Sequence, residues 1–228
     1  MHSILSRVFL AAFWMGLLLG APLANAQQWV EGKDYFVIQP AQRPSTPAGI
    51  IEVTEVFSYA CTYCNRAVPL MNKLKASLPP NAQMTYLPAS FNAGESWPMF
   101  QRVYYTAAAL GLIPKMHDAI YSGIWTSQEL AVTEPGGQKL KSPQPTLEDA
   151  ARFFQKKAGI KPEQFLATAK SFSVDANCRR ADAMVKAYRI EGTPTVIVNG
   201  HYKITGAVLG KQDELIELVK YLVAKEAG

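Results

Sequence analysis

The fold of this chain is decided at residues 50–64, which read IIEVTEVFSYACTYC. The first eight of these residues are mostly apolar or β-branched, which is typical of a central strand buried on both faces. The strand runs directly into a Cys-x-x-Cys turn at Cys61 and Cys64, and residues 65–78 carry apolar side chains at helical spacing. A first thiol in that position faces unpaired backbone N–H groups at the positive end of a helix dipole, which favours the thiolate. Because the thiolate is the form that attacks disulfides, the stretch predicts a redox-active dithiol.

Two other uses of a Cys-x-x-Cys pair fit the chain less well. A structural zinc site needs four ligands, and beyond the predicted leader the chain offers only Cys178 and the distant His117 and His201. A purely structural disulfide between residues three apart would remove little entropy from the unfolded chain. Redox chemistry is therefore the favoured interpretation, with no metal and no cofactor beyond the disulfide itself.

The first 26 residues have the pattern of a secretory signal peptide. Arg7 precedes an apolar run over residues 8–19, and Ala24-Asn25-Ala26 has the small-x-small form of a cleavage site. The run is shorter than the about 20 apolar residues that a membrane anchor needs. The sequence therefore predicts export to a compartment that permits disulfides, the bacterial periplasm, with cleavage near Ala26 and no anchor.

The charge pattern gives no support to nucleic-acid binding. The formal net charge is +5, and removal of the predicted leader takes away one arginine and no acidic residue. The remaining charge is spread along the chain, without a run of Lys and Arg interleaved with aromatic residues. About 200 mature residues suit one or two compact domains.

The rest of the chain predicts a strand–helix–strand unit that a block of helices separates from a late hairpin. Residues 35–38 could form a short edge strand before it, and Asn199-Gly200 is typical of a tight hairpin turn. The elements expected after the first helix are a strand at 84–87, a helical block at 95–172, a helix from a Ser173 cap to 188, strands at 195–198 and 202–204, and a helix at 211–225.

Two side chains in this plan have roles that spacing alone leaves open. Glu55 lies six residues before Cys61, and alternation is equally consistent with a surface carboxylate and with a buried one beneath the dithiol. A buried Glu55 would have a raised pKa and could take the proton that Cys64 must lose. Cys178 falls on the apolar stripe of its helix, where we expect a buried, inert thiol rather than a regulatory or dimer-forming one.

The order of these elements resembles the thioredoxin superfamily. The resemblance rests on the Cys61-x-x-Cys64 turn at a strand–helix junction, on Pro69 five residues later, and on Gly192-Thr193-Pro194-Thr195 opening a late strand. The leader, the helical insertion and the stretches at 55–61 and 193–200 narrow it to the DsbA branch, the periplasmic thiol:disulfide oxidoreductases.

Membership of that branch implies an α/β thioredoxin fold, with a mixed central sheet flanked by helices and an inserted helical domain. The expected divisions are a signal peptide at 1–26, the first part of the thioredoxin domain at 27–93, the inserted domain at 94–174, and the second part of the thioredoxin domain at 175–228.

The resemblance also implies roles for individual residues. Cys61 would be the attacking sulfur and Glu55 the buried proton acceptor, while a cis Thr193–Pro194 peptide would lie beside the dithiol. The residues expected to bind the substrate peptide are Thr62, Tyr63, Thr193 and Pro194. The substrates would be unfolded exported proteins, and a DsbB-like membrane partner coupled to quinone would reoxidise the dithiol.

The dipeptide between the cysteines departs from the best-known members, which carry Pro-His. Thr62-Tyr63 has no imidazole to support the Cys61 thiolate, so we expect a weaker oxidant whose Cys61 pKa is still lowered. Tyr63 and Thr193 also resemble residues of periplasmic disulfide isomerases. Those enzymes carry a separate dimerisation domain, for which too few residues lie between the leader and residue 50.

Three functions follow from these features. The favoured one is a monomeric oxidase of exported proteins with a shallow apolar groove, in which Trp97 or Trp125 could take part unless they belong to the core. The second is an isomerase or reductase that a membrane donor keeps reduced. The third is a protein without enzymatic activity that binds metal or holds clients.

Overall fold

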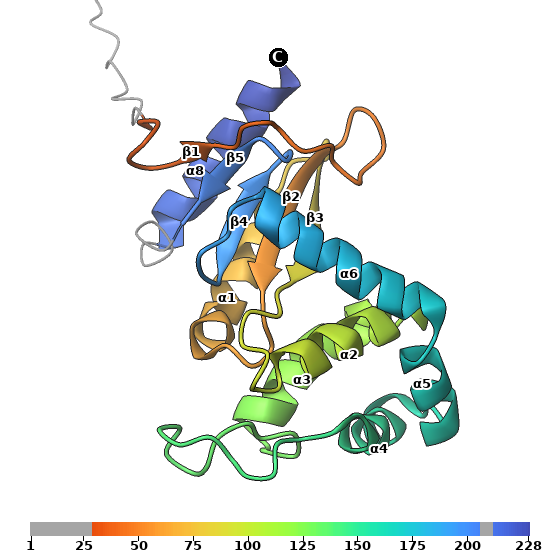
Figure 1. Ribbon diagram of the computed structural model, residues 1–228. Coiled ribbons are helices and arrows are strands. Elements are labelled where there is room, and N and C mark those ends of the chain that lie inside the picture. The colour runs from red at the N-terminus through yellow and green to blue at the C-terminus, as the bar shows by residue number, and fades with distance from the viewer. Residues whose placement is uncertain (1–28, 206–211) are drawn as a thin grey trace, which may run out of the picture.

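A five-stranded mixed sheet with helices on both faces carries the fold (Figure 1). The computed structural model describes residues 29–205 and 212–228, so the predicted leader and its cleavage site lie outside the described residues. The strands lie in the order β1-β5-β4-β2-β3. Their bounds are β1 Phe36–Val37, β2 Ile51–Phe57, β3 Ala82–Pro88, β4 Thr195–Val198 and β5 Tyr202–Ile204. The sheet and its flanking helices confirm the predicted α/β fold class.

Strand β2 lies between β4 and β3 in the sheet. All seven of its residues are buried, as the run of apolar and β-branched side chains predicts. It pairs in parallel with β3, where Glu55 lies opposite Tyr86, and antiparallel with β4, where Val56 lies opposite Thr195. The parallel pair confirms the predicted strand–helix–strand unit and places the exit of β2 beside the start of β4.

The hairpin of β4 and β5 turns at Asn199 and Gly200, as predicted. Their φ angles of 51° and 66° define a type I′ turn, which matches the natural twist of a two-stranded ribbon. A Cβ atom at Gly200 would overlap the carbonyl oxygen of Gln42, so the position requires glycine on steric grounds as well. β1 pairs antiparallel with β5 and forms one edge of the sheet.

Helices α1 and α8 cover one face of the sheet, and α6 lies against the other (Figure 1). Apolar side chains of α1 and α8, among them Leu74 and Leu218, pack on Val53 and Val196 of the sheet. The bounds of these helices are α1 Thr62–Ser77, α6 Phe172–Ala187 and α8 Gln212–Ala227. No helix in the described part of the chain is both long enough and apolar enough to cross a membrane.

The predicted helical block consists of α2 Trp97–Ala109, α3 Ile113–Trp125, α4 Leu147–Ala158 and α5 Pro162–Ala169. Thr146 and Asp149 form a reciprocal capping box at the start of α4, and Gly159 ends the helix with a φ of 74°. The prediction was wrong at the next junction. α5 ends at Ala169, and α6 begins at Phe172, ahead of the predicted Ser173 cap.

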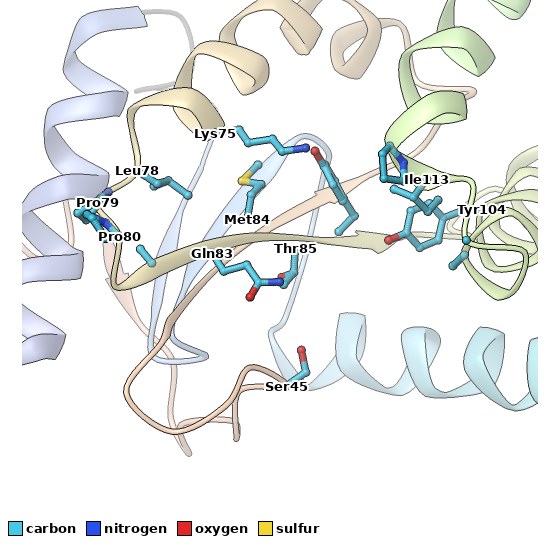
Figure 2. Close-up of a pocket in the computed structure, with 15 residues that line it drawn as sticks. Ser45, Lys75, Leu78, Pro79, Pro80, Gln83, Met84, Thr85, Tyr104 and Ile113 are labelled. Carbon is cyan, nitrogen blue, oxygen red and sulfur yellow. The ribbon is translucent and has the colours of Figure 1, made fainter.

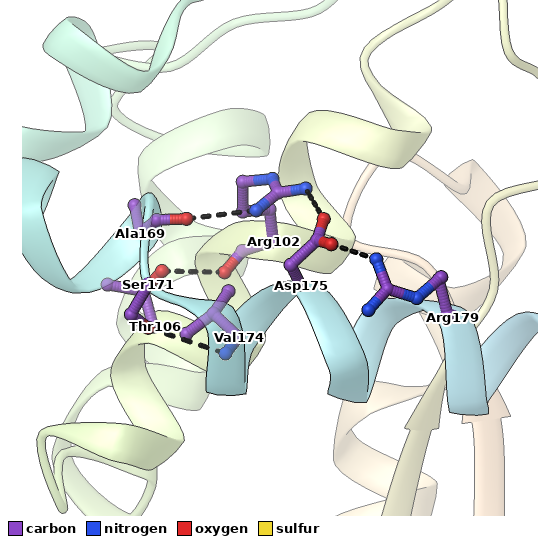
Figure 3. A network of polar contacts seen from close by, with 7 residues as sticks. All are labelled: Arg102, Thr106, Ala169, Ser171, Val174, Asp175 and Arg179. Carbon is purple, nitrogen blue, oxygen red and sulfur yellow. Dashed lines mark hydrogen bonds and ion pairs between the residues drawn. The ribbon is translucent and has the colours of Figure 1, made fainter.

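The cap of α6 explains this difference. Ser171, and not Ser173, accepts a hydrogen bond from the N–H of Val174 and so begins the helix two residues earlier. Figure 3 shows this junction together with Arg102 of α2, which donates to the carbonyl of Ala169 and to Asp175 at 2.9 Å each. The guanidinium therefore joins α2 to the end of α5 and the first turn of α6.

Candidate active site

The Cys-x-x-Cys turn is the N-terminus of α1. Cys61 is the N-cap residue, with extended backbone angles, and its sulfur accepts the N–H of Cys64 at 3.4 Å. The turn that leads into it is closed by Ser58, whose carbonyl accepts the N–H of Cys61 at 3.1 Å. The first turn of α1 contains no acidic side chain that would oppose a negative charge on the sulfur. The predicted placement at the positive end of a helix is therefore confirmed.

The two thiols of this turn differ in pKa. Hydrogen bonds from the Cys64 thiol and from the backbone N–H of Cys64 lower the pKa of Cys61 to about 6, against the opposing effect of burial. Burial raises the pKa of the Cys64 thiol well above its usual value, and the Cys61 sulfur beside it acts in the same direction. Cys61 is 7% exposed and Cys64 is fully buried. One thiol is therefore an anion near neutral pH while its partner keeps its proton.

The late strand brings a third part of the chain to the same point. The Thr193–Pro194 peptide is cis, as the resemblance implies, and the carbonyl oxygen of Thr193 lies 3.5 Å from the Cys61 sulfur. Thr195 closes the turn before β4 by donating its hydroxyl to the carbonyl of Gly192 at 2.8 Å. The antiparallel pairing of β4 with β2 holds Thr193 in place, although it lies 132 residues away from Cys61 in the sequence.

Glu55 is buried beneath the dithiol, so the structure settles the alternative that alternation left open. Its side chain is 2% exposed and shares a face of β2 with Val53 and Phe57. Burial raises the pKa of this carboxyl to about 8, with smaller contributions from Asp118 and from Cys61. An ionised Glu55 in turn helps to raise the pKa of the Cys64 thiol.

A second buried carboxylate in the same strand was not predicted from the sequence. Glu52 is 3% exposed and lies on the opposite face of the sheet, where its carboxylate accepts hydrogen bonds from Ser45 and Thr54. These donors replace the water that burial removes. The sequence does not show that Glu52 has hydrogen-bond donors, because one of them, the hydroxyl of Ser45, lies in a separate loop.

The helical block holds the segment before Cys61, through contacts that were not predicted from the sequence. Tyr59 is 1% exposed, and its hydroxyl is hydrogen-bonded to Nδ1 of His117 at 2.9 Å. Its carbonyl accepts the indole N–H of Trp125, also at 2.9 Å. Both partners belong to α3, so this helix fixes the side chain and the backbone of a residue two positions before the reactive sulfur. Burial lowers the pKa of His117 to about 4, which keeps the imidazole neutral near neutral pH.

The remaining predicted residues lie at the surface or in the core. Thr62 and Tyr63 are exposed beside Cys61, and Tyr63, at 70% exposed, has the guanidinium of Arg66 5.9 Å from its ring centre. Trp97 belongs to the core. Cys178 is buried on α6 as expected, and burial raises its pKa to about 11.

Nothing within residues 29–205 and 212–228 brings three His, Cys, Asp or Glu side chains together as a metal site would require.

Comparison with known proteins places this geometry in a family. A family model described as DSBA-like thioredoxin domain matches residues 52–215. The thiol:disulfide interchange protein DsbA of Pseudomonas aeruginosa PAO1 is 30% identical over 203 residues, which cover 89% of this chain and 88% of that protein. The protein of the same name from Bordetella pertussis is 30% identical over 216 residues, covering 91% and 89%.

Solved structures give the same result. The oxidoreductase DsbA from Xylella fastidiosa matches with a TM-score of 0.74 at 30% identity, covering 86% of this chain and 97% of that one. Pseudomonas aeruginosa DsbA matches with a TM-score of 0.73 at 29% identity, covering 88% and 96%. The similarity therefore extends over both the sheet and the helical block.

Proposed function

The chain belongs to the family of DSBA-like thioredoxin domains and is a thiol:disulfide oxidoreductase, and on that premise we propose that it oxidises exported proteins through Cys61 and Cys64. The observation that carries the proposal is the difference between the two thiols, one with a pKa near 6 and one with a raised pKa. A stabilised Cys61 thiolate stabilises the dithiol form, and a stabilised dithiol makes the disulfide a stronger oxidant. The geometry therefore favours donation of the disulfide over its retention.

The first step is attack by a client thiolate on the sulfur of Cys61 in the disulfide form. The bond between Cys61 and Cys64 breaks, a mixed disulfide forms between the client and Cys61, and Cys64 leaves as a thiolate. Because burial raises the pKa of Cys64, this sulfur must take a proton. Glu55, whose pKa of about 8 keeps it largely protonated near pH 7, is placed to supply that proton.

The second step releases the client. A second client thiolate attacks the client sulfur of the mixed disulfide and expels Cys61, which leaves as the stabilised thiolate. The client has then lost two electrons and gained a disulfide, and the pair at Cys61 and Cys64 has gained both electrons. In the reverse direction, when the pair is reoxidised, Glu55 takes the proton from Cys64 so that its thiolate can attack.

Client binding is proposed to use the surface around the turn. The main chain of Thr193 would pair with an extended client segment, beside Pro194 and the exposed side chains of Thr62 and Tyr63. The carbonyl of Thr193 lies 3.5 Å from the Cys61 sulfur, so a segment paired there would present its cysteine at the reacting atom.

Further assignments extend from the family. We propose that the protein is a monomer, that it works in the periplasm after cleavage near Ala26, and that a DsbB-like membrane partner passes its electrons to quinone. We also propose the domain division at 27–93, 94–174 and 175–228. The last boundary lies in the first turn of α6, which Asp175 joins to the helical block through Arg102.

The decisive experiment is the equilibrium of the Cys61–Cys64 pair with glutathione, measured in a Cys178→Ala background, together with trapping of the redox state in cells. The proposal predicts an oxidising pair that is trapped mostly as the disulfide. A pair trapped mostly as the dithiol would contradict the oxidase direction and favour an isomerase or reductase.

A further inference from the structure

The outer edge of β3 leaves main-chain groups without a partner. The carbonyl of Asn81 accepts the N–H of Ile51, and the N–H of Ala89 donates to Phe57, so both of these odd-numbered residues face β2. Because main-chain groups point to alternate sides along a strand, the N–H and C=O groups of Met84 and Tyr86 point away from β2. Within the part of the chain that the structure describes, nothing pairs with them, since β3 is the last strand of the sheet.

The two ends of this edge are closed. The N–H of Ala82 donates to the carbonyl of Pro79 at 2.9 Å. At the other end Pro88 has no N–H, and its carbonyl accepts the side-chain amide of Gln101 at 3.1 Å. The open edge therefore consists of the N–H and C=O groups of Met84 and Tyr86. These four groups are enough to pair with a short added strand.

Cavities lie on both sides of this edge. One of about 960 Å³ lies beside α1 and continues around the edge, since Figure 2 shows Lys75 and Met84 on the α1 side of the strand and Ser45 on the other side. A second cavity of about 300 Å³ lies beside α6. Thr85 and Tyr86 line both cavities, so the two spaces meet at the strand. Since the side chains of an added strand point to alternate faces, successive side chains would enter the two cavities in turn.

The two cavities differ in chemistry. The one beside α1 is lined mostly by apolar and aromatic side chains, with a single charged residue, Lys75; they include Leu78, Met84, Tyr104, Ile113 and Pro114. The one beside α6 carries two guanidinium groups, Arg43 and Arg180, neither of which forms an ion pair with the described residues. Its single carboxylate, Glu52, already accepts hydrogen bonds from Ser45 and Thr54.

We propose that the open edge of β3 binds an extended client segment as an added strand, with apolar side chains facing α1 and acidic side chains facing Arg43 and Arg180. Main-chain hydrogen bonds to Met84 and Tyr86 provide attachment, and the two cavities select the alternating pattern. The assignment of the occupant as a client rests on the proposed function, because unfolded substrates offer extended main chain.

The site is separate from the catalytic turn. β3 is two places away from β4 in the sheet order, so a segment on its outer edge does not occupy the surface beside Thr193. Strands in a sheet lie about 4.8 Å apart, so a segment added beyond β3 lies three spacings, on the order of 15 Å, from β4. A client held at β3 can therefore present a cysteine elsewhere in its chain to Cys61.

The first test uses a short cysteine-free peptide that alternates Val and Glu, with a Val–Lys peptide as the control. We expect saturable binding of the acidic peptide, with amide chemical-shift changes centred on Met84 and Tyr86, and about tenfold weaker binding of the basic one. Changes confined to the surface around Thr193, or no saturable binding, would overturn the proposal.

The second test asks whether the main chain is used. Two versions of the acidic peptide are methylated on alternate amide nitrogens, one on the set that would face β3 and one on the set that faces away. An added strand pairs through one set alone, so one version should lose about tenfold or more in affinity while the other binds normally. Equal binding of both versions would contradict strand addition.

The third test reverses the charges in the protein. Arg43→Glu combined with Arg180→Glu should weaken binding of the acidic peptide about tenfold, whereas Lys139→Glu with Lys141→Glu, the same change of charge on an exposed loop, should leave it unchanged. Equal effects of the two double variants would overturn the cation assignment.

A small dithiol peptide separates this proposal from the proposed function. Such a peptide is too short to reach β3, so the Arg43→Glu/Arg180→Glu variant should oxidise it at the wild-type rate while oxidising a long unfolded client more slowly. If no form of the protein oxidised the dithiol, the proposed function would fail and the occupant could not be a client. If both substrates were oxidised at unchanged rates, the proposed function would stand and the β3 site would be contradicted.

Discussion

Two cysteines of this protein are equally buried and have opposite chemistry. Cys61, at the N-terminus of α1, and Cys178, in the middle of α6, are each 7% exposed. The pKa of Cys61 falls to about 6, whereas that of Cys178 rises to about 11. Burial acts on both in the same direction, so burial cannot explain the difference.

The difference lies in the donors around each sulfur. The Cys64 thiol donates to the Cys61 sulfur, and because the first N–H groups of a helix have no intrahelical acceptor, the N–H of Cys64 is available to it as well. In the middle of α6 the N–H groups are taken by carbonyls one turn earlier, and Cys178 lies on the apolar stripe of the helix. The position of a cysteine along its helix therefore decides whether its thiolate is stabilised.

Replacing each sulfur in turn should give the largest contrast. Cys61→Ser should abolish oxidation of a reduced test protein, a loss of about a thousandfold or more, because the nucleophile and the transferred disulfide both disappear. Cys178→Ser should leave the rate within about twofold, since this thiol takes no part in exchange. The rates are measured by the recovery of activity of a reduced, unfolded enzyme. Comparable losses of rate in both variants would contradict the conclusion that only Cys61 takes part in exchange.

Glu55→Gln tests whether the carboxyl beneath the dithiol moves the proton. We expect release of Cys64 from the disulfide, and its return, to slow by about a hundredfold or more, because proton transfer by a placed side chain contributes about a hundred- to ten-thousandfold. Stopped-flow fluorescence of mixed-disulfide formation gives the rate. An unchanged rate together with an unchanged pH profile would exclude a role for Glu55 in proton transfer.

The same variant has a predicted effect on stability. A carboxyl whose pKa is raised to about 8 in the folded protein stabilises the fold at low pH, and this contribution is lost as the pH rises from about 4.5 to about 8. Glu55→Gln removes that loss, so it should raise the free energy of unfolding at pH 7 by about 3 kcal/mol. Below pH 4.5 the gain should vanish. Denaturant titrations at several pH values provide the measurement, and a gain that did not depend on pH would contradict the raised pKa.

Tyr63→His should sharpen the contrast between the two cysteines. A protonated imidazole beside Cys61 would lower the pKa of its thiol further and make the disulfide more oxidising, by about 30 mV for a tenfold change in the equilibrium constant. Because Tyr63 is 70% exposed, solvent screening limits the effect, and Tyr63→Phe serves as the control. A potential that is the same in all three proteins would mean that the residue at this position does not tune the pair.

The smallest effect is expected at Cys178. Cys178→Ala removes one buried sulfur from the apolar stripe of α6 and should cost about 1 kcal/mol of stability without changing the redox potential of the active pair. Thermal unfolding and the glutathione equilibrium measure the two quantities. A shift in the potential would mean that the two regions are coupled.

The sequence predicts the fold and the dithiol because both depend on local patterns. The buried strand, the Cys-x-x-Cys turn and the Asn199-Gly200 hairpin are read from neighbouring residues, and all three are confirmed. The start of α6 was misplaced because Ser171 and Ser173 offer the same cap chemistry two residues apart. Only the end of α5 at Ala169 decides between them.

The contacts that the sequence could not give are those made across the fold. Glu55 could be assigned to the interior only once α1 was placed over its face of β2. Tyr59 is held by His117 and Trp125, which lie 58 and 66 residues further along the chain. No local sequence pattern connects these residues. In the sequence His117 stands out only as a distant candidate zinc ligand, which does not indicate its hydrogen bond to Tyr59. The burial of a side chain and the hydrogen-bond donors around it depend on the assembled fold.

The most direct test is a pH titration of alkylation in the reduced wild-type protein, with each cysteine followed separately by mass spectrometry. The account predicts that Cys61 reacts with a midpoint near pH 6 and that Cys178, whose pKa lies near 11, stays unreactive through neutral pH. If Cys61 titrated near pH 9 like an ordinary thiol, or if the two cysteines titrated together, the claim that donors at the helix N-terminus create the reactive sulfur would be contradicted.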